Sequence, residues 1–438
     1  MHGEPPAKVP LAIIGGGAAA AWLLIMLRRL RGALPATVVI EPRATLGPGL
    51  AYSTALDSHR LNVTADKMDM HPVIGVDGFV DWLAAASGYG ADDHVPRRLY
   101  AHYLERLVAS ELAGEPMAHR QNRVVAVSRC AEGFGLTFAN GEELTAGRVV
   151  LAIGNPSSPP LCIDRAERVV EEPFGALPEL SWPPERVLVV GAGLTAIDAI
   201  LKLDHRWPRC TFSVVAPHPF FPPADKIVEP VAFEPAQPYP GPAGLWFWAK
   251  SHRSRAPFPE SWFSPIDGLR PHAAAIWQAW RPRERAIFLR YAARYWLHLR
   301  HRTAPQAALR IAQLQESGRL SWRRGRAVVR RADERSVVVA FGGLEQRFDL
   351  VINATGPDLD PRNERLLASL LDADLVSPDP LGLGIRVDKD CTVLATSGQR
   401  VEGLHALGVW TRGSLWEVVA VPHLREAIRS MLAPHPWP

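Results

Sequence analysis

The chain has little cysteine, and what it has is not paired. Its four cysteines (Cys130, Cys162, Cys210 and Cys391) lie far apart in 438 residues and form no C-x-x-C motif. This distribution argues against a disulfide scaffold, a zinc site and a dithiol redox centre. We therefore expect no metal, and we expect reduced, buried thiols in a cytoplasmic protein.

Excess charge and long apolar runs are also scarce. The net charge is only +4, with 47% hydrophobic and 21% charged residues, which is ordinary for a soluble globular protein and too mild to argue for nucleic acid. One uncharged stretch lies between Lys8 and Arg28, and no other approaches the length of a membrane span. The length suggests two or three domains, and we expect no membrane association.

The uncharged stretch "PLAIIGGGAAAAWLLIMLRRL" predicts a strand, a glycine turn and a helix. A secretory segment would end at a small-residue cleavage site, and a membrane helix rarely carries three adjacent glycines. Gly15 permits the turn, and Gly17 lets the backbone approach a pyrophosphate. Ala20 replaces the third glycine of G-x-G-x-x-G, while helix amides from Ala18 onward face the phosphates.

The next strand, "TVVIEP", ends in Glu41 and Pro42. A carboxylate at this place binds the adenosine ribose hydroxyls of a dinucleotide. A solvated acid at a strand end is the alternative. With the glycine box in register, the sequence predicts a nucleotide site.

The same pattern recurs at "ERVLVVGAGLTAIDAILKL". A strand over residues 187–190 leads into a second glycine box and a helix, and the alternative is a plain strand-to-helix turn. Two boxes argue for two dinucleotides. The expected contacts of the second are Gly191, Gly193, Leu194, Thr195 and Ala196.

Two further strands, "GRVVLAIGNPSSPP" and "DLVINATGP", stop at small residues, Ala152-Ile153-Gly154 and Ala354-Thr355-Gly356. Small residues let a backbone pass close to a cofactor. Two boxes with two such strand ends resemble the two-dinucleotide-binding flavoproteins, which implies FAD at the first box and NAD(P)H at the second.

The resemblance also implies an α/β fold with two Rossmann-like domains, the NAD(P)H domain being inserted into the FAD domain. We expect the first part of the FAD domain over residues 1–180 and its C-terminal part over 341–438. The inserted domain would span 181–340 and include a Pro/Trp-rich and Arg-rich segment that acts as a substrate or lid region.

The sequence indicates less clearly which nicotinamide cofactor, NADH or NADPH, binds at the second box. The strand "TFSVVAPHP" ends without an acid for a ribose 2′-hydroxyl and without an arginine pair for a 2′-phosphate. Arg206, Arg209 or His218 are the candidates for a 2′-phosphate site. We favour NADPH over NADH.

The stretch "LGPGLAYSTALDSHRLNVTADKMDMHPVIGVDGFVDWL" predicts a long ordered loop that lines a site and ends in a helix over 79–83. It resembles the bacterial FAD-NAD(P)-binding family, which includes an FAD-dependent urate hydroxylase, and more distantly the flavin-containing monooxygenases. The matching pieces are Gly47-x-Gly49-x-Ala51-Tyr52-Ser53, Leu61-Asn62-Val63 with Met68, "VPRRLYAHYL" with Arg98, "HLRHRTAPQAA" with His301-Arg302, and "GVWTRGSLWEVVAVPHLREAI".

By this resemblance Asn62 lies beside the flavin and is the leading catalytic candidate; a role in turning the loop is the alternative. In the C-terminal piece, Gly413 and Ser414 would precede a helix that begins near Leu415 or Trp416 and directs its positive end at the flavin, with a kink at Pro422. The remaining flavin contacts expected are Tyr52, Val63, Met68, Arg98, Val125, Ala152, Gly154, Gly356, Ser414, Leu415 and Trp416.

Residues 281–331 contain fourteen arginines against two glutamates. Without a recognisable nucleic-acid fold, a solvated face, pairing with acids elsewhere in the chain, or an anion site is favoured over nucleic acid. His301 is a candidate acid or base, and a phosphate-binding role is its alternative. Before this segment, Trp246, Phe247 and Trp248 either wall a substrate pocket or plug the core of the inserted domain.

The predicted function is an FAD-dependent, NAD(P)H-consuming monooxygenase that inserts one oxygen atom of O2 into a small, nitrogen-containing or heterocyclic molecule. One alternative is an NAD(P)H-dependent reductase or dehydrogenase without oxygenation. Another is a cofactor-binding regulator or partner protein.

Overall fold

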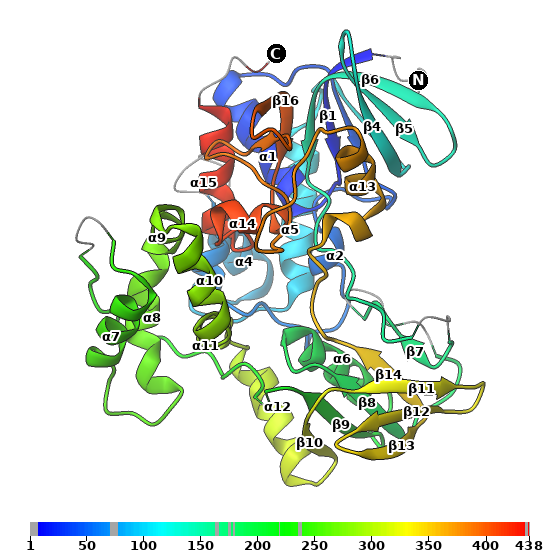
Figure 1. Cartoon of the computed structure of the whole chain (residues 1–438), viewed down its shortest axis with the longest axis vertical. Helices are drawn as coiled ribbons and strands as arrows, with labels where there is room; N and C mark the ends of the chain where they lie inside the picture. The colour runs from blue at the N-terminus through cyan, green and yellow to red at the C-terminus, as the bar shows by residue number, and fades with distance from the viewer. Residues whose placement is uncertain are drawn as a thin grey trace.

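The computed structural model describes residues 8–70, 78–162, 166–173, 177, 180–218, 220–234, 239–433 and 437. Three parts are visible in Figure 1. The first unit is built from the two ends of the chain, the second unit from residues 166–218 and 304–354, and a helical insert from residues 239–303. The predicted α/β architecture is confirmed, with a sheet whose centre is parallel in the first unit and a parallel sheet in the second.

The first unit is organised around a sheet whose centre is parallel. Strand β1 pairs in parallel with β2 and β6, and Ile14 lies opposite Ile40 on one side and Leu151 on the other. The carboxyl ends of these strands therefore meet at one edge, where dinucleotides bind in this architecture. The sheet order is β15 (Thr392–Leu394), β16 (Arg400–Ala406), β6 (Glu143–Leu151), β1 (Lys8–Ile14), β2 (Thr37–Ile40) and β3 (Met117–Arg120), with the hairpin β4 (Val124–Cys130) and β5 (Gly133–Phe138) attached to β6.

Helix α1 (Ala18–Arg31) forms because its sequence is a run of strong helix formers without a β-branched cluster. It buries Ala20 to Leu27 and ends at Gly32, whose φ of 85° is the left-handed conformation that stops a helix. The other helices of this unit are α2 (Gly49–Tyr52), α4 (Phe79–Ser87), α5 (Arg97–Glu111), α13 (Arg365–Asp372), α14 (Arg412–Leu415) and α15 (Val421–Leu432), with short 3-10 turns η1 (Ala65–Met68), η4 (Pro361–Asn363) and η5 (Val409–Thr411).

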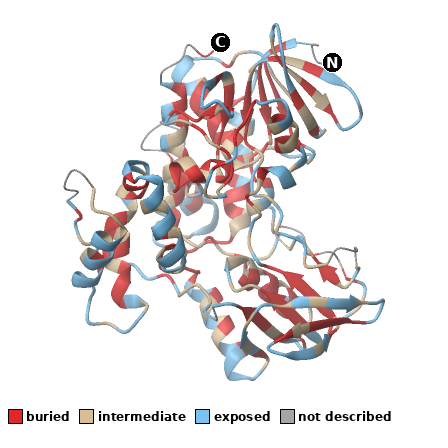
Figure 2. Ribbon diagram, viewed as in Figure 1, coloured by how far each residue is buried: buried red, intermediate tan, exposed pale blue. Residues whose placement is uncertain are grey.

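The second unit repeats the strand–turn–helix pattern on a smaller scale. Its five-stranded parallel sheet has the order β10 (Leu320–Arg324), β9 (Thr211–Ala216), β8 (Arg186–Val190), β14 (Leu350–Asn353) and β7 (Val169–Val170). Helices α6 (Leu194–Arg206) and α12 (Pro305–Glu316) pack on it, and β11 (Val328–Ala332), β12 (Val337–Phe341) and β13 (Leu344–Phe348) form an antiparallel meander. Buried residues follow the strands of both sheets (Figure 2).

Sheet pairing bears on the predicted domain limits. Strands β7 and β14 belong to the second sheet, although they lie outside the expected range 181–340. The chain passes back to the first unit after Asn353. The domain limits remain a prediction.

The helical insert has a core of its own, rich in tryptophan. It consists of α7 (Pro242–Ser251), η2 (Glu260–Trp262), α8 (Phe263–Leu269), η3 (Arg270–His272), α9 (Ala273–Ala279), α10 (Pro282–Tyr291) and α11 (Ala293–Arg300). Trp416 from the C-terminal segment joins this core, so the insert packs on the first unit as well as leading into the second. Of the helices that the structure describes, none combines the length and the apolar character needed to cross a membrane.

The C-terminal segment departs from expectation. The predicted helix start near Leu415 or Trp416 is wrong, because α14 ends at Leu415 and α15 begins only at Val421. Pro422 does not kink a helix. It lies in the first turn of α15, where the missing N–H of proline would have had no partner in any case.

Candidate functional site

Both glycine boxes begin with a glycine that no other residue can replace without strain. Gly15 has φ of 100°, and an added Cβ would lie 2.2 Å from the carbonyl oxygen of Ala152. Gly191 has φ of 110°, and its Cβ would lie 2.0 Å from the carbonyl oxygen of Ala354. The two boxes are thus the same construction, and each predicted small-residue strand end is the surface against which its glycine rests.

The helix that follows each box has a free N-terminus. Gly17 and Gly193 are the N-caps of α1 and α6, with no side-chain cap and no acidic residue in the first turn. The first amides, from Ala18 in α1 and from Leu194 and Thr195 in α6, are therefore available to an anion. Ala20 and Ala196 are buried against their sheets, as the close helix packing of a dinucleotide box requires.

Glu41 is held as an anion at the end of β2. Its carboxylate accepts the Gly16 N–H at 2.9 Å and the Arg43 Nε–H at 2.9 Å. Burial raises the pKa of this carboxyl, but the hydrogen bonds from Arg43 and Gly16 together lower it by more. The net shift of the pKa is therefore downward. Glu41 is therefore ionised beside the first box, where a ribose is expected, and Pro42 next to it is exposed.

The loop after Glu41 is fixed onto the first box. The Gly47 N–H donates to the Gly16 carbonyl at 2.8 Å. A Cβ on Gly17 would lie 3.3 Å from the Cα of Gly49, so the two backbones pass close together. The predicted approach of backbone to a pyrophosphate at Gly17 therefore involves Gly49 as well.

An aromatic cluster anchors the next predicted contacts. The rings of Tyr52 and Tyr100 meet edge to face at 4.8 Å. The Tyr100 hydroxyl accepts from Trp22 Nε1 at 3.1 Å and donates to the Met68 carbonyl at 3.4 Å. Helices α1 and α5 thereby hold both ends of the predicted flavin loop, and Tyr52 and Met68 lie in one cluster.

Asn62 and Val63 occupy a bend between two backbone anchors. The Leu61 N–H donates to the Val95 carbonyl at 2.8 Å, and the Ala65 N–H donates to the Asp93 carbonyl at 3.0 Å. The half-buried Asn62 side chain forms no hydrogen bond with any residue that the structure describes, and it does not cap the 3-10 turn that follows. Its amide is therefore available to a ligand, and its catalytic role stays a prediction.

The other predicted flavin contacts are less distinctive. Arg98 is paired with Asp57 at the surface. Val125 is half-buried at an irregularity of β4. Gly154 and Gly356 both have positive φ, with no atom within 4 Å of an added Cβ. Nothing in these surroundings excludes a cofactor, and their roles stay predictions.

At the C-terminal segment, the Ser414 hydroxyl accepts the Val387 N–H at 3.0 Å, and Leu415 is buried. Trp416 then adopts φ of 62° and ψ of −71°, and the Glu417 N–H closes a tight turn onto the Leu415 carbonyl at 2.9 Å. This is the strained form of the γ-turn. It turns the Trp416 ring into the helical insert.

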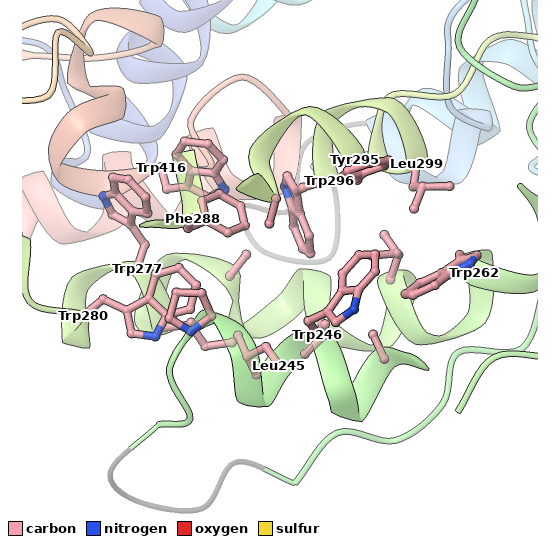
Figure 3. A pocket seen from close by; sticks show the side chains of 17 residues that line it. Leu245, Trp246, Trp262, Trp277, Trp280, Phe288, Tyr295, Trp296, Leu299 and Trp416 are labelled. Atoms are coloured by element: carbon pink, nitrogen blue, oxygen red, sulfur yellow. The ribbon is translucent and has the colours of Figure 1, made fainter. Parts of the chain in front are cut away.

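In the helical insert, the Trp416 ring closes an apolar cavity of about 670 Å³, including the opening to solvent (Figure 3). The Trp416 ring stacks on Trp277 at 4.6 Å and 24° and meets Phe288 edge-on at 5.2 Å. The cavity is lined by Pro242, Leu245, Trp246, Ala249, Trp262, Ile266, Leu269, Ala273, Ile276, Trp277, Trp280, Phe288, Ala292, Tyr295, Trp296, Leu299 and Trp416.

Of the three aromatic residues expected to wall a pocket, Trp246 does so. Phe247 is 66% exposed, and Trp248 packs edge-on against Phe233 at 4.8 Å, outside the cavity. The inward face of helix α7 carries Pro242, Leu245, Trp246 and Ala249, at the three- and four-residue spacing of a helix face, and Phe247 and Trp248 lie off that face.

A buried ion pair lies behind the cavity wall. The Glu417 carboxylate accepts from Trp296 Nε1 at 3.0 Å and lies 3.5 Å from Arg300 Nη2. Burial raises the pKa of Glu417, but Arg300, His423 and His301 outweigh it and the net shift is downward. No sequence pattern indicates this role, because a single Glu after a tryptophan belongs to no recognisable motif.

His301 lies at the end of α11 and does not line the cavity. Burial, and then the charge of Arg300, lower the pKa of His301 to about 4. It is therefore neutral near pH 7. A positively charged phosphate-binding role is disfavoured, and its predicted role as acid or base is untested.

Part of the arginine-rich segment is structural rather than a solvated face. Arg302 is buried, lies 3.8 Å above the Phe263 ring and bonds to Asp267 through both terminal nitrogens at 3.0 Å. Arg310 and Arg319 both pair with the buried Asp204. For these three arginines the structure shows pairing with acids elsewhere in the chain, which is one of the alternatives that the sequence left open.

The two units meet through polar side chains. Arg97 Nη1 donates to the Asp198 carboxylate of α6 at 2.7 Å, and His59 Nε2 lies 2.8 Å from the Asp198 carbonyl oxygen. A second cavity, of about 410 Å³ including its opening to solvent, lies here between residues 50–59 of the first unit and Thr195 and Lys202 of α6. The sequence-predicted loop and the second box thus share one cleft.

Comparisons with known proteins agree with this geometry. A family model described as FAD-NAD(P)-binding matches residues 12–156. No curated protein matches the chain in sequence.

Similar solved structures cover nearly all of the chain. The ornithine N-hydroxylase of Kutzneria sp. 744 has 17% identity and a TM-score of 0.68, over 97% of this chain and 98% of that one. L-lysine 6-monooxygenase from Pseudomonas syringae has 16% identity and a TM-score of 0.61, over 97% of each chain. Bacillithiol disulfide reductase from Staphylococcus aureus has 14% identity and a TM-score of 0.58, over 98% of this chain and 99% of that one.

The expected resemblance and the expected FAD and NAD(P) cofactors are confirmed. The residues present fit these groups, since two uncapped helix ends follow two glycine turns and an ionised Glu41 stands beside the first. The chain therefore contains an FAD-NAD(P)-binding domain over residues 12–156 and has the fold of the two-dinucleotide-binding flavoproteins.

Proposed function

We propose that this protein is an FAD-dependent, NAD(P)H-consuming monooxygenase that acts on a small organic substrate. The observation that carries the proposal is the position of Trp416. The segment with the predicted flavin contacts Ser414 and Leu415 continues directly into the wall of an apolar cavity. Oxygen transfer needs such a water-poor space beside the cofactor. Two of the similar structures are a hydroxylase and a monooxygenase by name.

The overall reaction consumes substrate, O2, NAD(P)H and a proton, and yields hydroxylated product, NAD(P)+ and water. When bound, FAD supplies the transfer of electrons from NAD(P)H to oxygen. The residues of this chain bind the cofactors and orient the reacting groups. The N-terminal amides of α1 and α6 hold the two pyrophosphates, and Glu41 holds a ribose. The Asn62 amide donates and accepts hydrogen bonds near the reacting atoms without titrating.

A reductase without oxygenation is the second candidate, because a disulfide reductase shares the fold. Two of the four thiols argue against the dithiol form of this activity, whereas Cys130 is exposed and Cys162 is half-buried, so the expectation of buried thiols is wrong for these two. Cys210 and Cys391 are buried, and burial raises the pKa of Cys210 to about 11 and that of Cys391 to about 12. Such thiols are poor nucleophiles at neutral pH. A regulatory or partner role, the third alternative, predicts negligible nicotinamide oxidation.

We expect oxygen to react in two observable stages with the reduced enzyme. The FAD-loaded protein would be reduced anaerobically with NADPH and mixed rapidly with oxygenated buffer while the flavin absorbance is followed. A transient spectrum distinct from both reduced and oxidised flavin supports the monooxygenase. Direct return to the oxidised spectrum, both alone and with substrate candidates present, favours the reductase.

The same experiment tests Asn62. In Asn62→Ala the transient is expected to decay about tenfold faster or more, because the amide that supports it through hydrogen bonds is lost. Flavin content should not change. Asn140→Ala, in the exposed turn between β5 and β6, is the matched control and should behave as the native protein. An unchanged transient in Asn62→Ala would remove the catalytic assignment.

The preference for NADPH is supported by Arg324 of strand β10 rather than by Arg206 or Arg209. Arg209 precedes β9 and Arg206 ends α6, so both lie at the amino edge of the parallel sheet, opposite the nucleotide edge. Arg324 lies opposite Ala216 at the carboxyl ends of β10 and β9, is exposed, and has no ion-pair partner among the residues described. His218 lies just beyond the same edge.

Arg324→Ala is therefore expected to raise the KM for NADPH about tenfold, since a charge-assisted bond to the 2′-phosphate is lost. The KM for NADH should not change. Arg335→Ala, which removes the same charge from the β11–β12 turn, should leave both constants unaltered. Equal effects of Arg324→Ala on NADPH and NADH would contradict the assignment. Steady-state oxidation of the two nicotinamides measures each constant.

A further inference from the structure

We infer that the cavity between the helical insert and Trp416 is the substrate site, and that its substrate is a neutral, planar aromatic molecule carrying a hydrogen-bond acceptor. The inference rests on the proposed function for the reaction, whereas occupancy of the cavity can be measured without turnover. The cavity is concave and lined mostly by aromatic and apolar side chains, as small-molecule sites usually are.

The lining excludes a charged ligand. Not one Asp, Glu, Lys or Arg is among the lining residues that the structure describes, and the wall is almost wholly apolar. An amino acid or a diamine brings charges that need partners, and burying an unpaired charge is strongly unfavourable. The substrate class therefore differs from the ornithine and lysine named for the similar structures.

Three of the lining tryptophans are oriented by their own hydrogen bonds. The indole N–H groups of Trp277, Trp280 and Trp296 donate to the Gly413 carbonyl, the Pro240 carbonyl and the Glu417 carboxylate, at 2.9, 2.9 and 3.0 Å. The polar edges of these rings are thus bound to protein, which leaves their apolar carbon surfaces to line the cavity. Aromatic surfaces favour stacked or edge-on contact with another ring.

Two further tryptophans keep their donors. The rings of Trp246 and Trp262 lie 4.7 Å apart, and neither indole N–H has a hydrogen-bond partner among the described residues. Figure 3 shows this pair at one end of the cavity and Trp416 with Phe288 at the other. A ligand stacked between these ends would place an acceptor toward the Trp246 and Trp262 end.

The strained turn at Trp416 supports a functional use of the ring. A positive φ in a bulky residue is unfavourable and persists only where its surroundings determine it. Here the ring is stacked on Trp277, met by Phe288 and covered by the Arg412 guanidinium at 4.7 Å. The turn thus makes Trp416, itself a predicted flavin contact, an aromatic wall of the cavity directly after Ser414 and Leu415.

The test is equilibrium binding of quinoline to the full-length, FAD-loaded, oxidised protein, measured by dialysis, with L-ornithine as the charged comparison. Quinoline is neutral at pH 7.5, planar, and carries a single acceptor nitrogen. We expect a Kd on the order of 0.1 mM for quinoline and binding at least about tenfold weaker for L-ornithine.

Three variants locate the bound quinoline. Trp246→Ala is expected to weaken binding about tenfold, and Ala249→Phe, which fills the cavity from the same helix, to abolish it. Phe247→Ala is the matched control, because this neighbouring ring points to solvent, and its Kd should equal that of the native protein.

The inference is overturned if quinoline does not bind the FAD-loaded protein, if L-ornithine binds as tightly, or if Trp246→Ala and Ala249→Phe leave the quinoline Kd unchanged. These outcomes are separable from failure of the proposed function. Binding with the expected variant pattern but no reaction with oxygen would contradict only the monooxygenase. Oxygen reactivity without such binding would contradict only the substrate class.

Discussion

We expect Gly191→Ala to retain FAD but to be reduced by NADPH at least about a hundredfold more slowly. This corresponds to an increase of about 2.7 kcal/mol in the activation barrier. Its φ of 110° is unfavourable for alanine, and the new Cβ would lie 2.0 Å from the Ala354 carbonyl oxygen. Either the turn or β14 must move, and α6 with its anion-binding amides moves with the turn. The first unit has a separate sheet and core, so its flavin should remain.

The measurement is the FAD-to-protein ratio together with the anaerobic rate of flavin reduction by NADPH, with dithionite as a check that the flavin is reducible. Gly193→Ala is the matched comparison. Its φ is −82° and an added Cβ meets no protein atom within 4 Å, so only a bound dinucleotide would feel that methyl group. Gly15→Ala should show the reverse pattern, with loss of FAD itself. Native NADPH reduction in Gly191→Ala would remove the second box from the nicotinamide site.

The two glycine boxes could be predicted from the sequence because each is formed by residues that are close together in the chain. Strand, glycine turn and helix follow one another in about twenty residues in this motif, and the turn conformation determines which residue is permitted. The predictions for Gly15, Gly191 and the strand ends at Ala152 and Ala354 therefore agree with the backbone found. Even the pairing of each glycine with its alanine follows from parallel strand order.

The walls of the cavity depend on long-range packing and were only partly predictable. Trp246 was identified from aromatic content, but that content equally suggested Phe247, which is exposed. The end of α14 at Leu415 is determined by contacts of Trp416 with Trp277 and Phe288, more than a hundred residues earlier. Likewise the sequence leaves open whether Arg302 pairs with an acid, and its partner Asp267 follows only from the packing of the insert. Contacts between residues that are far apart in the chain cannot be predicted from the sequence around each of them.

Glu417→Ala is expected to lower the free energy of unfolding by about 3–5 kcal/mol. The Arg300 side chain is only 2% exposed, and burial lowers the pKa of Arg300 to about 10 even with Glu417 present. Without the carboxylate its charge stays buried and unpaired, and the Trp296 indole N–H loses its acceptor. Urea unfolding of the FAD-loaded protein, followed by tryptophan fluorescence, measures the change.

The pH dependence of the same transition gives an independent readout. The pKa of Glu417 is lower in the folded protein than in the unfolded chain, so its contribution is complete above the unfolded pKa near 4.5 and is lost as pH falls through the folded value. His301 acts in the same direction, because its folded pKa of about 4 lies below its unfolded value near 6.5. Native stability should therefore fall from about pH 6.5 downward through His301, and the additional fall that Glu417 causes below about pH 4.5 should be absent in Glu417→Gln, which lacks the titrating carboxylate.

Two outcomes separate the ion pair from simple loss of side-chain volume. Glu417→Gln keeps an acceptor for Trp296 but not the charge, and should lie between the native protein and Glu417→Ala. The double variant Arg300→Met with Glu417→Leu removes both charges and should recover most of the lost stability, since apolar replacements of buried pairs are often neutral. If the double variant is as unstable as Glu417→Ala, the pair stabilises through packing alone. If Glu417→Ala unfolds like the native protein, Arg300 is not held by this carboxylate, and the orientation of Trp296 in the cavity wall needs another cause.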